Sequence, residues 1–74
     1  MKTWLNWLAE CEYEFKRIDN GEENCRVYDF GNGITVMKVE KGKGSRGGTV
    51  IVNGFTTFHG SVKDLTERIE ELLG

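Results

Sequence analysis

Apolar positions follow a helical period near the start of this 74-residue chain. They recur at steps of four, three, four and three, which is the spacing of one helix face. The stripe consists of Trp4, Leu8, Cys11, Phe15 and Ile18. It predicts an amphipathic helix over residues 3–18, which the sequence Asp-Asn-Gly at 19–21 ends. Trp7 lies at the edge of the stripe and is expected in the core.

The middle of the chain has the pattern of short β-strands. Strands are predicted at 25–30, 34–39 and 49–52, followed by a return strand to about residue 58. Gly31-Asn32-Gly33 and Asn53-Gly54 are predicted hairpin turns, because Asn and Gly tolerate the positive φ that tight hairpins need. No connection is long enough for a parallel crossover, so the strands are expected to form an antiparallel meander.

A second helical period ends the chain. Ser61 and Asp64 resemble a capping box, and apolar residues follow at steps of three, four and three. The stripe is Val62, Leu65, Ile69 and Leu72. The predicted fold is therefore a single α+β domain over 1–74, a two-layer sandwich of order α-β-β-β-β-α. Both amphipathic helices are expected on one face of the sheet.

Apolar residues also occupy both sides of the predicted strands. Only one side can face the helices, so Tyr28, Phe55 and Phe58 are candidates for aromatic side chains that stay partly open. The strand register that would decide between them does not follow from the pattern.

Charge is segregated along the chain, although the net charge is only −2. Residues 1–24 carry −3, residues 25–60 carry +3 and residues 61–74 carry −2. The basic middle contains a glycine-rich segment, 41–48, in an otherwise acidic chain. Such segregation bears on the choice of partner more than on the fold.

The residues do not form a pattern typical of an active site. His59 is the single histidine, and neither Cys11 nor Cys25 has a base near it in sequence, so a nucleophile with an adjacent base is not indicated. The glycines at 42, 44 and 47 match G-x-G-x-x-G, but a strand follows where a dinucleotide site needs a helix. We expect no enzyme activity, no metal and no cofactor. The two cysteines are expected to be reduced thiols in a cytoplasmic protein, and no apolar run has the length of a membrane span.

The basic segment is either a nucleic-acid contact or a flexible solvated connection. Its cations are Lys38, Lys41, Lys43 and Arg46. Cations among glycines can approach a phosphate chain closely. The element order resembles that of double-stranded-RNA-binding domains, which have three strands and a lysine-rich start to the last helix. Here four strands are predicted and the last helix begins Ser61-Val62-Lys63-Asp64, so membership is not inferred.

A protein partner is the favoured hypothesis. Helical geometry places Tyr13 opposite the first stripe, next to acidic residues, as in many binding hot spots. The last helix carries acids on its outer face, including two where the helix dipole disfavours them. The predicted binding residues are Glu10, Tyr13, Glu14, Glu67, Glu70 and Glu71.

These features predict a small non-enzymatic interaction module that binds a larger protein or complex. An inhibitor or accessory protein of phage or mobile-element type, for example against a host defence nuclease complex, is the specific form of this hypothesis. The alternative is RNA or DNA binding through residues 41–48. A homodimer is a further expectation to test.

Overall fold

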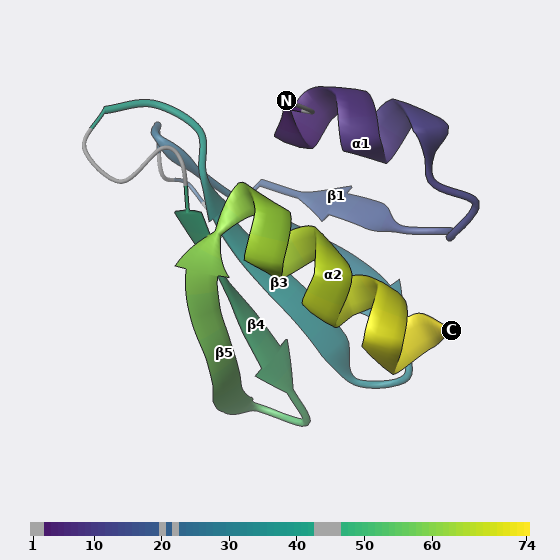
Figure 1. The fold of residues 1–74 in the computed structure, drawn as a ribbon. Helices are drawn as coiled ribbons and strands as arrows, with labels where there is room; N and C mark the ends of the chain where they lie inside the picture. Colours follow the sequence, from purple (N-terminus) through teal and green to yellow (C-terminus); the bar gives the residue numbers. More distant parts are fainter. Residues whose placement is uncertain (1–2, 20, 22, 43–46) are drawn as a thin grey trace.

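Five antiparallel strands form one open sheet, and two helices pack on one of its faces (Figure 1). The structure is a computed structural model that describes residues 3–19, 21, 23–42 and 47–74. The α+β class is confirmed. In chain order the elements are α1 (Trp4–Glu10), β1 (Lys16–Ile18), β2 (Cys25–Gly31), β3 (Ile34–Val39), β4 (Gly47–Val52), β5 (Phe55–Ser61) and α2 (Val62–Leu73).

The sheet is a simple meander in which each strand pairs with the next, in the order β1-β2-β3-β4-β5. Both predicted hairpin turns are confirmed. Asn32 and Gly33 have φ values of 54° and 79°, and Asn53 and Gly54 have values of 52° and 86°. Positive φ at both central residues is the turn geometry that matches the twist of two paired strands. The Asn53 N–H donates to the Gly33 carbonyl oxygen at 2.9 Å, which ties the two turns together at one end of the sheet.

The predicted long first helix is wrong. Thr3 caps α1 by accepting from the Asn6 N–H at 3.2 Å, but the helix ends at Glu10 and the Cys11 backbone is extended. Phe15 reaches the core from an extended segment and packs edge-on against Tyr28 with ring centroids 5.9 Å apart. The apolar residues kept a helical spacing beyond the end of α1, because the chain turns back after α1 and its side chains reach the same core from an extended segment.

The last three residues of that predicted helix form an additional strand. β1 pairs with β2, with Lys16 opposite Asp29 and Ile18 opposite Val27, which makes five strands in place of the predicted four. The last strand is also longer than predicted, since β5 continues to Ser61. In both places backbone pairing with a neighbouring strand decided the outcome, and one-dimensional periodicity does not carry that information.

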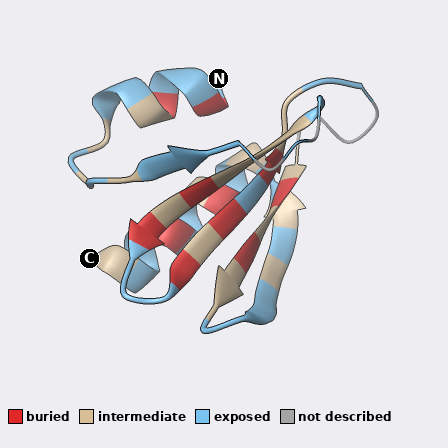
Figure 2. Ribbon diagram, turned by 180° about the vertical axis from the view of Figure 1, so that it is seen from behind, coloured by how far each residue is buried: buried red, intermediate tan, exposed pale blue. Residues whose placement is uncertain are grey.

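The core lies between the sheet and the helices, and Figure 2 shows buried residues alternating with less buried ones along the central strands. Trp4 and Trp7 both enter it from α1, so the expectation for Trp7 is confirmed. Their rings stack with centroids 5.3 Å apart, and Trp4 meets Tyr28 edge-on at the same distance. A helix of only seven residues is marginal alone, so this aromatic packing is what holds α1 in place. The buried apolar residues are Trp4, Trp7, Tyr28, Phe30, Ile34, Val36, Val50, Leu65 and Ile69.

The second helix follows its prediction more closely. The Ser61 hydroxyl accepts from the Asp64 N–H at 3.5 Å, and Leu65 and Ile69 are fully buried. The end of the stripe is wrong, because Leu72 is 39% exposed whereas Leu73 packs against the core. The helix thus presents the predicted face to the sheet except in its last turn.

Candidate protein-binding surfaces

The face of the sheet opposite the helices is uncovered among the described residues (Figure 2). Strand register places one row of side chains across this face on all five strands. Two of its apolar members are unusually open, since Ile18 is 43% exposed and Met37 is 38% exposed. The row consists of Ile18, Val27, Met37, Thr49 and His59.

Two further apolar residues lie next to this row on the same face of the sheet. Cys25 pairs with Val39 on the next position of the same face, and both are half-buried. We call the set Ile18, Cys25, Val27, Met37 and Val39 the open-face patch. Sequence reasoning saw apolar residues on both sides of the strands but could not group these five. The grouping needed the register and the unpredicted strand β1.

The three aromatic residues that were candidates for an open position differ in their exposure. Tyr28 is buried on the helix side, which excludes it. Phe58 is half-buried against the core, and Phe55 is 75% exposed at the start of β5.

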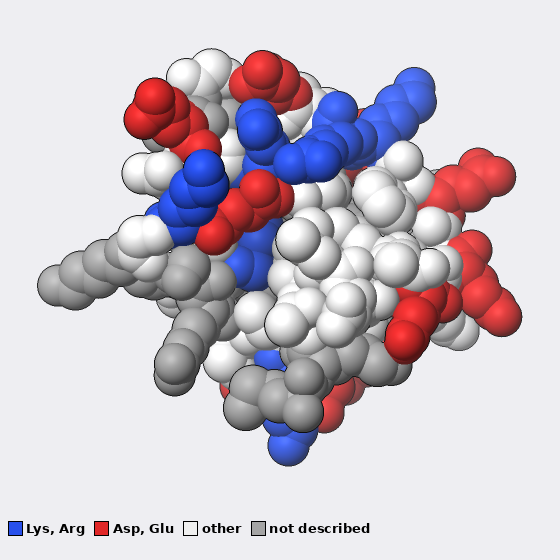
Figure 3. Space-filling model, turned by 90° about the horizontal axis from the view of Figure 1, so that it is seen from above, with Lys and Arg blue, Asp and Glu red and all other residues white. Residues whose placement is uncertain are grey.

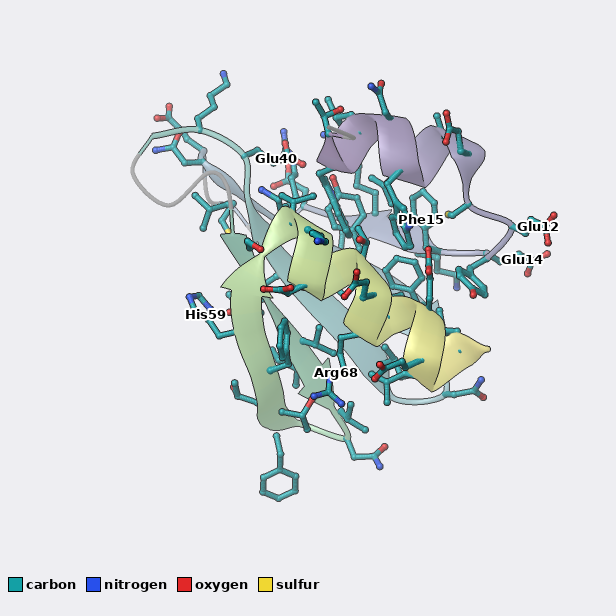
Figure 4. The ribbon with its side chains drawn as sticks, viewed as in Figure 1. Glu12, Glu14, Phe15, Glu40, His59 and Arg68 are labelled. Atoms are coloured by element: carbon teal, nitrogen blue, oxygen red, sulfur yellow. The ribbon has the colours of Figure 1, made fainter. Side chains whose placement is uncertain are left out.

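The first predicted acidic site is only partly assembled. Glu10 and Glu14 are exposed, and Figure 4 shows Glu14 pointing away from the turn between α1 and β1. Tyr13 is not the exposed residue that a long helix implied. It is half-buried against the core, and its hydroxyl group lies near Gly74 at the end of α2. The correction follows from the early end of α1, which moves Tyr13 off the outer helix face.

α1 and α2 are in contact, and one residue of the second acidic set, Glu70, meets α1 there. The Trp7 indole N–H donates to Glu70 Oε1 at 2.9 Å. This bond accounts for an acid in the last turns of α2, where the helix dipole is unfavourable. Glu70 therefore has a structural role that the sequence did not reveal.

The other two acids of α2 point elsewhere. Glu67 and Glu71 both line a shallow groove beside Phe58, and Glu71 pairs with Arg68 at 3.6 Å. The Arg68 guanidinium in turn lies over the Phe58 ring, 5.3 Å from its centroid. The six predicted residues thus do not form one site, because Glu67 and Glu71 share the groove beside β5, Glu70 bonds Trp7 and Tyr13 packs against the core.

A second charged group gathers around Glu40, beside the start of α1 (Figure 4). The Tyr28 hydroxyl donates to Glu40 Oε1 at 2.5 Å, and Glu40 Oε2 lies 3.7 Å from Arg17 and 3.9 Å from Arg26. Burial raises the pKa of Tyr28 and the bond to Glu40 adds to this, while Trp4 and Arg17 act in the opposite direction. The Glu40 carboxylate links β1, β2 and the end of β3, so the role of this group is structural.

Lys38 was expected among the exposed cations, and the structure contradicts this. It is 2% exposed, on the same face of β3 as Ile34 and Val36, and its ammonium donates to the Val39 carbonyl oxygen at 2.5 Å. The pKa of Lys38 is lowered overall, because the effect of burial is larger than the opposing effects of Glu40 and Cys25. A lysine in this position is not available to a phosphate chain.

Gly48 explains how Lys38 fits beneath α2. A Cβ at Gly48 would stand 2.6 Å from Leu65 Cδ2 and 3.3 Å from Lys38 Cδ. One glycine of the basic segment is therefore required by packing within β4. Lys41 is exposed, whereas the predicted contacts at 43 and 46 lie outside the described residues.

The remaining chemistry-bearing side chains have local partners. His59 Nδ1 lies 2.8 Å from Thr49 Oγ1 across the open face, and the Cys11 thiol contacts the Leu8 carbonyl oxygen at 3.4 Å. In the described ranges, no group of three or more His, Cys, Asp or Glu is placed to hold a metal ion. Neither α1 nor α2 is long and apolar enough to cross a membrane.

Figure 3 shows the charge distribution on the side that carries α1. Basic and acidic side chains lie side by side near the end of β3, while acidic side chains gather toward the opposite end. On this side of the molecule, a mixed-charge end is thus separate from an acidic one.

No family model, curated protein or solved structure matches this chain. Its function has to be inferred from the surfaces described above.

Proposed function

We propose that this chain is a non-enzymatic protein-interaction module that docks through the open-face patch. One observation carries the proposal: five apolar side chains are contiguous on a sheet face that no described element covers. Antiparallel sheets with one solvated face usually carry polar residues there. An exposed contiguous apolar surface is typical of a protein-binding site.

The partner is a larger protein with an apolar surface of its own. The open-face patch is bordered by a row that begins with Lys16, Asp29 and Thr35 and continues to the half-buried Ile51 on β4, so that its β1–β3 part suits the polar rim of an interface. Methionine is enriched at such interfaces, and Met37 stands in the middle of the patch. We therefore assign Met37 the central contact.

An inhibitor or accessory role of phage or mobile-element type, such as blocking a host defence nuclease complex, is the specific form of this proposal. The sheet face that no described element covers supports a docking role of this kind. The free thiols of Cys11 and Cys25 agree with a reducing, cytoplasmic location. RNA or DNA binding has less support, because Lys38 is buried and Arg17 and Arg26 both neighbour Glu40.

The decisive experiment compares two exposed apolar residues on opposite sides of the molecule. Met37→Lys changes the open-face patch, and Leu5→Lys changes α1, where Leu5 is 63% exposed. A partner is first captured with the unaltered chain and identified, and its binding to each purified variant is then measured by calorimetry. Met37→Lys is expected to weaken binding by about 10-fold or more, as at a hot spot, while Leu5→Lys leaves it unchanged.

Charge-reversal variants of the acidic residues test whether the binding site lies on the helix side instead. Charge reversal at Glu10 and Glu14, or at Glu67 and Glu71, leaves binding within about 3-fold if the open-face patch is the site. Loss of binding in these variants with full binding by Met37→Lys would move the site to the helix side. Binding only to RNA or DNA, with a steep loss in salt, would replace the proposal by the alternative.

A further inference from the structure

The two edges of the sheet are built differently. β1 has only three residues, all exposed, and two of them are Lys16 and Arg17. Short, charged edge strands resist pairing with other chains. β5 has seven residues, Phe-Thr-Thr-Phe-His-Gly-Ser, with no lysine, acid or proline. Among the described residues no strand pairs with its outer edge, so alternate backbone N–H and C=O groups there face solvent.

One part of this edge is regular. The register with β4 shifts between Val50 and Ile51, and the Thr57 hydroxyl donates to the Val50 carbonyl oxygen at 3.3 Å. Such a bulge bends a strand and interrupts pairing. Beyond it the register is continuous over residues 58–61, so this stretch is the one suited to accept a further strand.

The flank of α2 beside that stretch is acidic. A shallow groove runs between the helix and β5, and Figure 4 shows Arg68 facing the strand from the helix. Three carboxylates and one guanidinium line it, and the guanidinium pairs with Glu71 at 3.6 Å and lies over the half-buried ring of Phe58. The lining residues are Phe58, Asp64, Glu67, Arg68 and Glu71.

We propose that residues 58–61 of β5 accept an extended, basic segment of a protein partner as a sixth strand. Backbone hydrogen bonds supply the pairing, and Lys or Arg side chains on the helix side meet Glu67 and Glu71. Charge decides the occupant. Two copies of this chain joined through β5 would bring their acidic α2 flanks toward each other, whereas a basic segment is attracted to the same flank.

This surface is distinct from the open-face patch. An added strand extends the sheet sideways at β5, while the patch lies on β1, β2 and β3. The inference therefore goes beyond the proposed function, and separate variants test the two. Met37→Lys should leave strand addition unchanged.

The test uses the whole chain, labelled with ¹⁵N, and the acetylated peptide amide Lys-Thr-Lys-Val-Lys-Thr-Lys as the probe. Chemical shifts and amide exchange are followed by NMR. The peptide is expected to shift the amide signals of 58–61 and to slow exchange of those amide protons that face the edge. Two matched peptides serve as controls: one has N-methyl groups on the residues whose N–H groups would bond β5, and the other has Glu in place of Lys. Neither is expected to bind.

A pair of variants tests the acidic flank. Glu67→Gln with Glu71→Gln should weaken peptide binding by about 3- to 10-fold, and Glu10→Gln with Glu14→Gln should not. Equal binding of the N-methylated peptide, equal binding of the acidic peptide, or protection at β1 would each overturn the proposal. Protection of 58–61 that grows with protein concentration in the absence of peptide would also overturn it, in favour of a second copy.

Discussion

The helix-covered face and the open face of the sheet are formed by alternate residues of the same strands. On β3, Val36 is fully buried under the helices while its neighbour Met37 is 38% exposed. Both faces carry apolar side chains, so hydrophobicity alone does not separate them. The two faces differ because the helices pack on only one of them, and no described residue covers the other. The helix residues that bury the first face are Trp4, Trp7, Leu65 and Ile69. Packing against the helices therefore stabilises one face, while the other is uncovered among the described residues and is the face proposed for binding.

The largest expected effect comes from removing cover. Leu65→Ala should lower the free energy of unfolding by about 2–5 kcal/mol, because Leu65 is fully buried and its loss leaves a cavity. Met37→Ala on the open face should cost less than about 1 kcal/mol. Urea denaturation of both variants measures the difference. Equal losses would mean that the open face is also covered.

A smaller loss is expected from overfilling the covered face. Gly48→Ala places a Cβ 2.6 Å from Leu65 Cδ2 and 3.0 Å from the Met37 carbonyl oxygen. Such overpacking should destabilise the chain by about 1–3 kcal/mol. Combining it with Leu65→Val should cost less than the two single changes added together, since the smaller side chain leaves room. Strict additivity in this double-mutant cycle would contradict the assigned clash.

The bond between the two helices is expected to contribute less. Glu70→Ala removes the acceptor of the Trp7 indole N–H and should cost about 1 kcal/mol. Glu71→Ala is the matched control, since its ion pair with Arg68 is exposed and contributes about 0–1 kcal/mol. Thermal unfolding, together with Trp fluorescence as a report on Trp7, distinguishes them. A larger loss for Glu71→Ala would contradict the bridging role of Glu70.

The smallest change at neutral pH is expected at Lys38. Lys38→Met replaces a buried amine by an apolar side chain of similar length and should be neutral or stabilising. In the parent chain burial lowers the pKa of Lys38 below 10.5, so the unfolded state binds more protons in that alkaline range. The stability of the parent should therefore rise relative to Lys38→Met as pH increases toward 10.5.

Denaturation of both chains between pH 7 and 10.5 measures this difference. Tyr28 contributes in the opposite sense, because its raised pKa lets the folded state retain a proton above pH 10, and it does so equally in both chains. A difference between the chains that stays constant with pH would contradict a lowered pKa at Lys38.

Local rules predicted some elements well. Asn53-Gly54 and Asn32-Gly33 specify their turns through positive φ, which few other residues adopt. Ser61 specifies the start of α2 through a side chain three residues from the amide that it caps. These signals act within four residues, and tertiary packing left them unchanged.

The site residues were less predictable, because each depended on an element from elsewhere in the chain. Tyr13 moved inward when α1 ended at Glu10, and Lys38 was assigned to a solvated segment although β3 holds it beneath α2. Glu70 acquired a partner 63 residues away. Neither residue spacing nor composition predicts a contact between residues so far apart in the chain.

The sequence by itself determined the α+β class, both hairpin turns and the beginning of each helix, because these depend on backbone geometry and short-range hydrogen bonds. Only the tertiary structure decided that 16–18 pairs as a strand, that Lys38 is buried and that five apolar side chains share an uncovered face. Those outcomes depend on strand register and on which elements cover a surface. Both are set by packing between segments far apart in the chain, where the free energy of the whole fold outweighs local preference.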